Sequence, residues 1–189
     1  MAFEDTQITI NDLSFNIEGK TLLHNTNLSL NRDGITVLLG ANGAGKTIFL
    51  KLLTGLLTPC SGSITFEGGN LSIKTRAFVS QEPVILRRTV LKNMLFVLEK
   101  ITSEKSTLAK ELLSLMGLDK KENQNALTLS AGEKQRLCLA RAIITDPEIL
   151  LLDEPTANIE PNSTTLIEKY LIQKVRSSRK IFFVTHDIN

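Results

Sequence analysis

An eight-residue stretch in the first third of the chain has the composition of a loop that binds phosphate groups. It matches the pattern G-x-x-x-x-G-K-[ST] at every fixed position, with Gly40, Ala41, Asn42, Gly43, Ala44, Gly45, Lys46 and Thr47. Because glycine has no Cβ atom, the backbone can wrap closely around phosphate oxygens, and its N–H groups can form an anion cradle. Lys46 would then reach the β- and γ-phosphates of ATP, and the Thr47 hydroxyl would bind Mg²⁺. The alternative is a glycine-rich turn that arose by chance.

Two carboxylates follow a second apolar run later in the chain. The run is Ile149–Leu152, and Asp153 and Glu154 come directly after it. Ligands of open α/β sheets bind at the carboxyl ends of the strands, where the glycine-rich loop also begins. We therefore expect Asp153 to hold Mg²⁺, directly or through water, and Glu154 to act as the general base on the attacking water. Taken alone, the pair is equally well explained as two solvated carboxylates at a strand end.

Strands that alternate with helices must position these residues. Apolar and β-branched runs predict strands at 7–17, 27–30, 35–39, 63–66, 77–80, 149–152 and 181–185. Helical patterns cover 47–57, 89–117, 130–146 and 163–175. The runs 35–39, 149–152 and 181–185 are short and continuous, so each is expected to be buried on both faces. The alternation predicts the α/β class with a mainly parallel core sheet.

The stretch from about 82 to 127 interrupts this alternation because it carries helical patterns only. We predict a single domain over 1–189. Its nucleotide-binding core comprises 1–81 and 136–189, and a helical subdomain, 82–135, is inserted into it.

Bulk composition narrows the functional classes. The chain has 189 residues, is 42% hydrophobic and 22% charged, and has a formal net charge of +2. This balance gives no reason to expect nucleic acid as a partner. The two cysteines, Cys60 and Cys138, are far apart and are expected to be reduced thiols in a cytosolic protein. The first ten residues do not resemble a signal peptide, and no apolar run approaches the ~18 residues of a membrane span, so a membrane role would require a partner.

An octapeptide between the two phosphate-site motifs carries a family resemblance. The sequence from Leu129 to Arg136, LSAGEKQR, resembles the LSGGQ signature of ABC ATPase subunits with its basic continuation. Ser130 and Glu133 also form the S-x-x-E pattern of a capping box, which predicts a helix start with free N–H groups. The alternative is an ordinary capped helix.

The resemblance runs from about residue 8 to the end of the chain. It implies the ABC ATPase fold, a P-loop NTPase fold with an antiparallel β part near the N-terminus. It also implies a head-to-tail homodimer that encloses two ATP molecules. Within that dimer, the helix start faces the γ-phosphate of the ATP bound by the other subunit, through Ser130, Ala131, Gly132 and Glu133.

Two further residues fit the family by position. Gln81, after the strand predicted at 77–80, resembles the Q-loop glutamine, which implies contact with Mg²⁺ and the attacking water. His186, after the strand predicted at 181–185, resembles the switch histidine that contacts the γ-phosphate. Taken alone, a glutamine or a histidine at the end of a strand does not indicate a function. Family members continue beyond this histidine, whereas the sequence ends at Asn189, so both a compact and a shortened member stay open.

The chain departs from the family pattern at several places. Ala131 replaces a glycine and Glu133 a glutamine in the signature, and Glu160 replaces the usual aspartate of the D-loop. The position at which an adenine-stacking aromatic is expected holds Ile17, and Phe15 would substitute only with a shifted register.

The segment 83–90, PVILRRTV, resembles importer ATPases of the tungstate, molybdate and phosphate type. In the family, this region receives the membrane subunits, although packing within the helical subdomain explains its apolar residues equally well. The resemblance implies transmembrane permease subunits, an indirectly linked solute-binding protein and a place on the cytoplasmic face of the membrane. The alternatives are a soluble ABC ATPase that acts on ribosomes or DNA, a short exporter ATPase of the haem-export type, and an inactive regulator. The presence of Lys46, Asp153, Glu154 and His186 argues against the inactive regulator.

Overall fold

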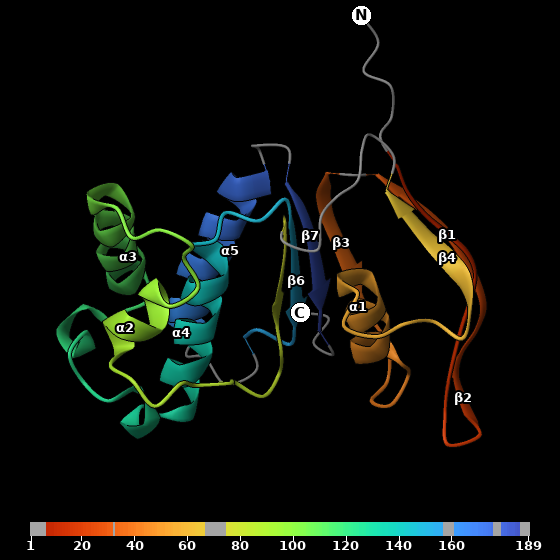
Figure 1. Ribbon diagram of the computed structural model, residues 1–189, viewed down its shortest axis with the longest axis horizontal. Coiled ribbons are helices and arrows are strands. Elements are labelled where there is room, and N and C mark those ends of the chain that lie inside the picture. The colour runs from red at the N-terminus through yellow and green to blue at the C-terminus, as the bar shows by residue number, and fades with distance from the viewer. Residues whose placement is uncertain (1–6, 32, 67–74, 157–160, 176–178, 186–189) are drawn as a thin grey trace, which may run out of the picture.

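The computed structural model describes residues 7–31, 33–66, 75–156, 161–175 and 179–185. Its strands form two sheets (Figure 1). The first is antiparallel, with the strand order β2-β1-β4, and contains β1 (Gln7–Ile17), β2 (Lys20–Asn31) and β4 (Ser61–Phe66). The second is parallel, with the order β3-β7-β6-β5, and contains β3 (Gly34–Leu38), β5 (Arg76–Val79), β6 (Ile149–Asp153) and β7 (Lys180–Val184). The predicted α/β class with a parallel core sheet and an N-terminal antiparallel part is confirmed.

The helices largely follow the predicted pattern. They are α1 (Lys46–Thr54), α2 (Val90–Leu95), α3 (Ser103–Leu115), α4 (Ala131–Ile143) and α5 (Pro161–Val175), with 3₁₀ turns at Asp119–Lys121 and Ala126–Thr128. The continuous pattern over 89–117 is two helices, because Thr102 caps a new helix start through its hydroxyl. The strand predicted at 27–30 is only the last part of β2. None of the described helices is long and apolar enough to cross a membrane.

Helix α1 lies between the two sheets and forms one core with them (Figure 1). Phe49, Leu50 and Leu53 of α1 pack with the inward side chains of β1 and with one face of β6 and β7. This packing fixes the start of α1 close to the carboxyl ends of the parallel strands.

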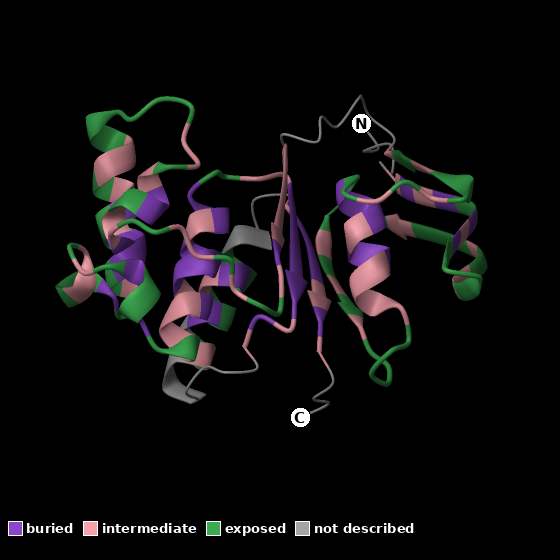
Figure 2. Ribbon diagram, turned by 60° about the horizontal axis from the view of Figure 1, so that its bottom comes forward, coloured by how far each residue is buried: buried purple, intermediate pink, exposed green. Residues whose placement is uncertain are grey.

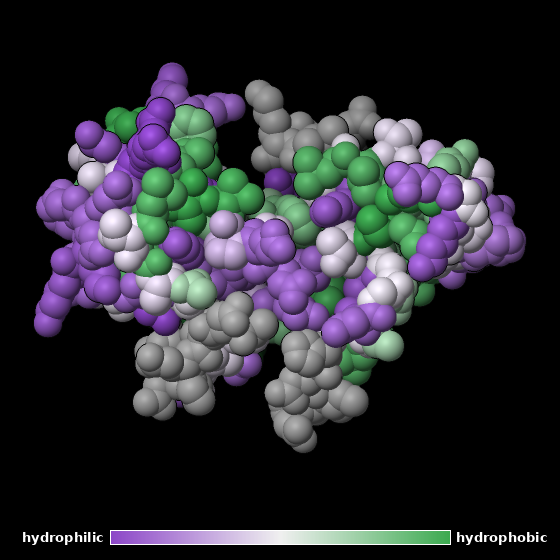
Figure 3. Space-filling view, turned by 90° about the horizontal axis from the view of Figure 1, so that it is seen from below, coloured by the Kyte–Doolittle hydropathy of each residue, from purple (hydrophilic) through white to green (hydrophobic). Residues whose placement is uncertain are grey.

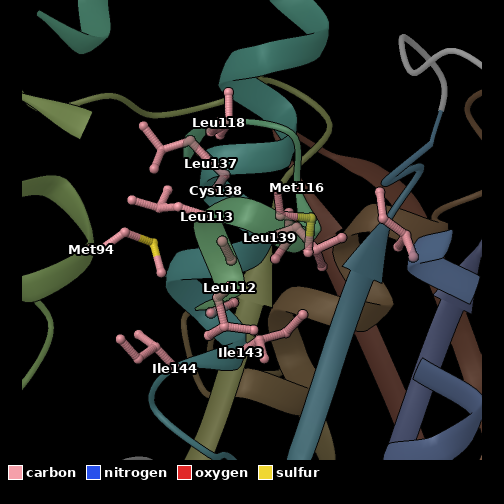
Figure 4. Packing of buried hydrophobic residues seen from close by; sticks show 14 of the residues in the cluster. Met94, Leu112, Leu113, Met116, Leu118, Leu137, Cys138, Leu139, Ile143 and Ile144 are labelled. Atoms are coloured by element: carbon pink, nitrogen blue, oxygen red, sulfur yellow. The ribbon is translucent and has the colours of Figure 1, made fainter. Parts of the chain in front are cut away.

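The opposite face of the parallel sheet packs against α4 and α5. Leu150, Leu152 and Ile181 join a second core that continues into α2 and α3. Figure 4 shows part of it, where Met94 and Leu113 lie around Leu137. Helix α4 crosses the predicted boundary at 135/136 without a break, so one helix belongs to both the sheet layer and the helical part.

The predicted burial of the three continuous strands is correct for two of them. Every residue of β6 is buried, as are four of the five residues of β7 (Figure 2). The expectation for 35–39 was wrong, because Ile35 is 44% exposed and Val37 is 50% exposed. Strand β3 lies at the sheet edge, paired with β7, and α4 and α5 cover β6 and β7 on the same face. Ile35 and Val37 of β3 therefore continue the apolar face of the sheet beyond the area that α4 and α5 cover.

Candidate nucleotide-binding and hydrolysis site

The glycine-rich loop joins β3 to α1 at the carboxyl end of the parallel sheet. Gly43 and Gly45 have φ angles of 80° and 87°, a left-handed conformation that suits glycine. A Cβ on Gly45 would lie 3.0 Å from the backbone oxygen of Leu22, so β2 approaches the loop closely at this point. The amide of Phe49 bonds to the Gly45 carbonyl at 2.9 Å, and helix α1 begins there. The loop thus ends on a helix N-terminus, the arrangement that attracts phosphate.

The side chain of Lys46 folds back over the loop that precedes it. Its Nζ donates hydrogen bonds to the carbonyl oxygens of Gly40 at 2.6 Å and Ala41 at 2.9 Å. Two loop carbonyls thus hold the ammonium group across the loop. A cation in this place complements a phosphate chain that binds against the loop amides.

Thr47 and Asp153, two of the three residues predicted to contact Mg²⁺ together with Gln81, meet directly. The Thr47 hydroxyl donates to Oδ2 of Asp153 across 2.7 Å, although the residues are 106 positions apart in sequence. Asp153 is 3% exposed and ends β6, while Thr47 stands on the first turn of α1. Hydroxyl and carboxylate oxygens are the ligand type that Mg²⁺ prefers.

Gln81 and Glu154 form a second pair beside the first. Nε2 of Gln81 donates to Oε2 of Glu154 across 2.9 Å. Strands β5 and β6 are parallel neighbours with Val79 opposite Leu152, so both residues stand two positions past a matched pair. Glu154 has a φ of 48°, which is unusual for a residue with a side chain, and its amide bonds to the carbonyl of Val184 at 3.1 Å. Such backbone strain costs roughly 1–3 kcal/mol and concentrates at functional sites.

These groups line one open hollow, here called the P-loop hollow. The described residues that line it are Lys20, Leu22, Asn42, Gly43, Ala44, Gly45, Lys46, Thr47, Ile48, Gln81, Asp153 and Glu154. The structure thus brings together the loop, the acidic pair and Gln81, which the sequence placed in three separate segments. Figure 3 looks onto this end of the molecule, where hydrophilic side chains occupy the middle and hydrophobic groups lie to either side.

Sequence reasoning missed the contribution of β2 to the P-loop hollow. Lys20 and Leu22 lie in the part of β2 that precedes the predicted strand at 27–30. The alternative that Phe15 stacks on adenine is wrong, because Phe15 is 7% exposed and packs in the core around α1. Ile17 is 43% exposed and is not among the described residues that line the hollow.

The predicted capping box at the start of α4 is confirmed. The Ser130 hydroxyl accepts from the Glu133 amide at 3.3 Å, and the Glu133 carboxylate accepts from the Ser130 amide at 3.0 Å. Residues 130–133 are not among the described residues that line the P-loop hollow. The start of α4 is therefore separate from the phosphate loop of its own chain. His186 and the D-loop residue Glu160 lie outside the described residues.

Side chains from α2 and α4 hold the loop 80–89, which contains Gln81. Asn93 is fully buried, and its amide bonds to both the N–H and the carbonyl of Leu86. From α4, Gln135 donates to the carbonyl of Ser80 at 3.3 Å, and Arg141 donates to that of Val84 at 2.7 Å. These polar anchors were missed, although Asn93 interrupts the apolar stripe of a predicted helix, which was the available signal.

A parallel sheet with a phosphate-binding loop between β3 and α1 defines a P-loop nucleotide-binding domain. The family model described as "ABC transporter" matches residues 23–157. The tungstate uptake system ATP-binding protein TupC of Peptoclostridium acidaminophilum is 34% identical over 97% of this chain and 88% of its own length. The aliphatic sulfonates import ATP-binding protein SsuB 1 of Nocardia farcinica is 36% identical over 100% of this chain and 75% of its own length.

A solved structure, cbiO1 from Clostridium perfringens, part of the ABC transporter complex cbiONQ, superposes with a TM-score of 0.78 at 26% identity. The superposition covers 98% of this chain and 80% of that one. The chain therefore belongs to the ABC transporter ATP-binding family, the ATP-hydrolysing subunits of transporters.

Proposed function

We propose that this chain energises an importer of a small oxyanion by hydrolysing ATP in the P-loop hollow. The observation that carries the catalytic part is the placement of the pairs Thr47–Asp153 and Gln81–Glu154 beside the phosphate loop in one hollow. The loop amides and Lys46 bind the phosphates. Thr47, Asp153 and Gln81 would hold Mg²⁺, and the bound ion would neutralise negative charge on the phosphates.

Glu154 is the general base in this proposal. Its carboxylate takes a proton from the attacking water as the water oxygen bonds to the γ-phosphorus. The bond from that phosphorus to the bridging oxygen breaks, and ADP leaves with the electron pair. The hydrogen bond from Gln81 orients the carboxylate, and His186 is proposed to contact the γ-phosphate. The Asp153 carboxylate with the Thr47 hydroxyl beside it suits Mg²⁺, which is usually bound by one or two carboxylates together with phosphates and water.

The signature segment serves a second copy of the chain. Ser130, Ala131, Gly132 and Glu133 stand at a capped helix start, apart from the P-loop hollow. A helix N-terminus favours an anion. We propose that in a head-to-tail homodimer this end meets the γ-phosphate of the ATP that the other copy holds.

The helical part, proposed as the subdomain 82–135, receives the permease. Val84 is 66% exposed, whereas Ile85 packs against the second core, so the segment 83–90 is only partly used for internal packing. An open groove beside it is lined by apolar residues, among them Phe78, Val84 and Val97, and by charged ones, among them Arg76 and Arg141. Exposed apolar side chains with polar residues around them fit a protein partner. The permease would hold the chain on the cytoplasmic face of the membrane and link it indirectly to a solute-binding protein.

The substrate class is inferred from two sources. The segment PVILRRTV resembles tungstate, molybdate and phosphate importers, and the relatives named above act in tungstate uptake and sulfonate import. Both solutes are tetrahedral oxyanions or carry such a group.

Three variants and one purification test these proposals. Lys46→Ala should lose ATP binding in equilibrium dialysis, and Glu154→Gln should form an ATP-dependent dimer on size exclusion while hydrolysis is lost. Ser130→Arg should lose hydrolysis but keep ATP binding by the monomer. Purification from native membranes should retain a permease and an oxyanion-binding protein. Retention of ribosomal or DNA-associated proteins without a permease would overturn the importer assignment and leave the nucleotide chemistry unaffected.

A further inference from the structure

Both carboxylate oxygens of Glu133 are engaged at the start of α4. Oε2 accepts from the Ser130 amide at 3.0 Å, and Oε1 accepts from Nζ of Lys121 at 2.5 Å. The side chain of Glu133 is 16% exposed and that of Lys121 is 37% exposed. The ion pair therefore lies at the surface edge of the helix start, with the carboxylate more enclosed than its partner.

Lys121 reaches α4 from a separate and well-anchored turn. It ends the 3₁₀ turn Asp119–Lys121, and its amide bonds to the carbonyl of Leu118 at 3.0 Å. Leu118 is fully buried in the second core, and the amide of Gln124 bonds to the Lys121 carbonyl at 2.9 Å. The backbone thus presents this ammonium group to Glu133 from a fixed position.

A carboxylate at this place creates an electrostatic conflict. The first turn of α4 offers its positive end to one anion, and Glu133 already supplies a negative charge there. A phosphate that approaches the same turn would meet a like charge, which disfavours binding. The signature that this segment resembles carries a neutral glutamine at the position, so the conflict comes from the glutamate of this chain.

We propose that Lys121 is a positioning residue of the nucleotide site. It balances the charge of Glu133 and holds its carboxylate in the capping box, so that the helix start stays available to phosphate. This inference rests on the proposed function, because the phosphate in question belongs to ATP held by a second copy.

The protonation behaviour of Glu133 agrees with this role. The hydrogen bond from Lys121, followed by that from the Ser130 amide, lowers the pKa of Glu133. The carboxylate is therefore ionised at neutral pH, and its charge has to be balanced whenever phosphate binds.

A double-mutant cycle in the Glu154→Gln background tests the pairing. The readout is the ATP concentration that gives half-maximal dimer by light scattering. Lys121→Met should raise that concentration roughly two- to fivefold, the upper part of the range for a partly exposed charge pair. For Lys121→Arg, which keeps the charge, this concentration should stay near that of the parent. When Glu133→Gln is also present, Lys121→Met should change the ATP concentration for half-maximal dimer by less than about twofold, because no charge remains to be balanced.

If Lys121→Met causes the same loss with and without the Glu133→Gln substitution, the pairing is overturned and the dimer proposal stands. Absence of ATP-dependent dimer in the Glu154→Gln parent would overturn both, so the two failures are distinguishable. Thermal melts accompany each variant. If Lys121→Met lowers the folded fraction, Lys121→Gln replaces it, because glutamine keeps a hydrogen-bond donor and removes the charge.

Discussion

The side-chain amide of Gln81 is bonded to the carboxylate of Glu154, with 2.9 Å between Nε2 and Oε2. The two residues follow neighbouring parallel strands, β5 and β6, and they join the loop 80–89 to the proposed general base. Movement of that loop would therefore alter the orientation of Glu154. This contact links the region proposed to meet the permease with the bond that is broken in ATP.

Glu154→Gln should lower ATP hydrolysis by roughly two to four orders of magnitude, because general-base catalysis contributes about that much. Gln81→Ala should lower it less, since Glu154 keeps its backbone position through the bond from its amide to Val184. Both variants should bind ATP as the parent does, measured by fluorescent-nucleotide titration alongside phosphate release. Normal turnover in Glu154→Gln would exclude Glu154 as the base.

Thr47→Val should weaken the use of Mg²⁺ while preserving side-chain volume. It removes the hydroxyl that donates to Asp153 at 2.7 Å. We expect the Mg²⁺ concentration for half-maximal hydrolysis to rise at least roughly tenfold, as for the loss of other metal-site groups. Thr47→Ser, which retains the hydroxyl, is the matched control. An unchanged Mg²⁺ titration in Thr47→Val would remove Thr47 from the metal site.

Asn93→Ala should destabilise the fold by about 2–3 kcal/mol, because it removes a fully buried side-chain amide that makes several hydrogen bonds to the backbone of the loop 80–89 and leaves the N–H of Leu86 without that partner. Asn93 is fully buried and bonds to the backbone of Leu86, Arg88 and Thr89. For a domain of this size, the melting temperature should fall by roughly 4–12 °C. The exposed Asn123 provides the control, and Asn123→Ala should stay within about 0.5 kcal/mol of the parent in urea titrations.

The contribution of Glu133 to stability should depend on pH in a defined direction. Its folded-state pKa lies below the ordinary value of 4.5, chiefly because of the Lys121 hydrogen bond. The contribution is therefore present above about pH 4.5 and is lost as the pH falls through the lower, folded-state pKa. The difference in unfolding free energy between the parent and Glu133→Gln should shrink between about pH 5 and pH 3. A difference that stays constant over this interval would contradict the assigned ion pair.

The features predicted from sequence are those set by residues close together in the chain. The Ser130–Glu133 capping box and the helix start after the glycine-rich loop depend on spacings of a few residues, and both are present. The meeting of Thr47 with Asp153 was also predictable, because parallel strands bring their carboxyl ends to one edge.

Other features depend on which surfaces pack together, and no local pattern encodes this. The run 35–39 has the composition of a central strand, yet its exposure is decided by how far α4 and α5 extend across the sheet. The engagement of Glu133 by Lys121 likewise requires the 3₁₀ turn to fold back on α4. The phosphate site was predicted because its motif is local in sequence. The distant contacts that hold neighbouring elements in place were not predicted.

Helix α4 spans about 20 Å at 1.5 Å per residue, and Gln135 and Arg141 lie along it beyond the signature end. The first turn of α4 is proposed to contact the nucleotide of a neighbouring copy, and side chains further along the helix hold the loop that contains Gln81. A displacement at one end would be transmitted to the other, because the helix is unbroken and the side chains between its ends are packed in the core. Each copy would thus sense the neighbour's ATP and prepare its own active site in a single movement.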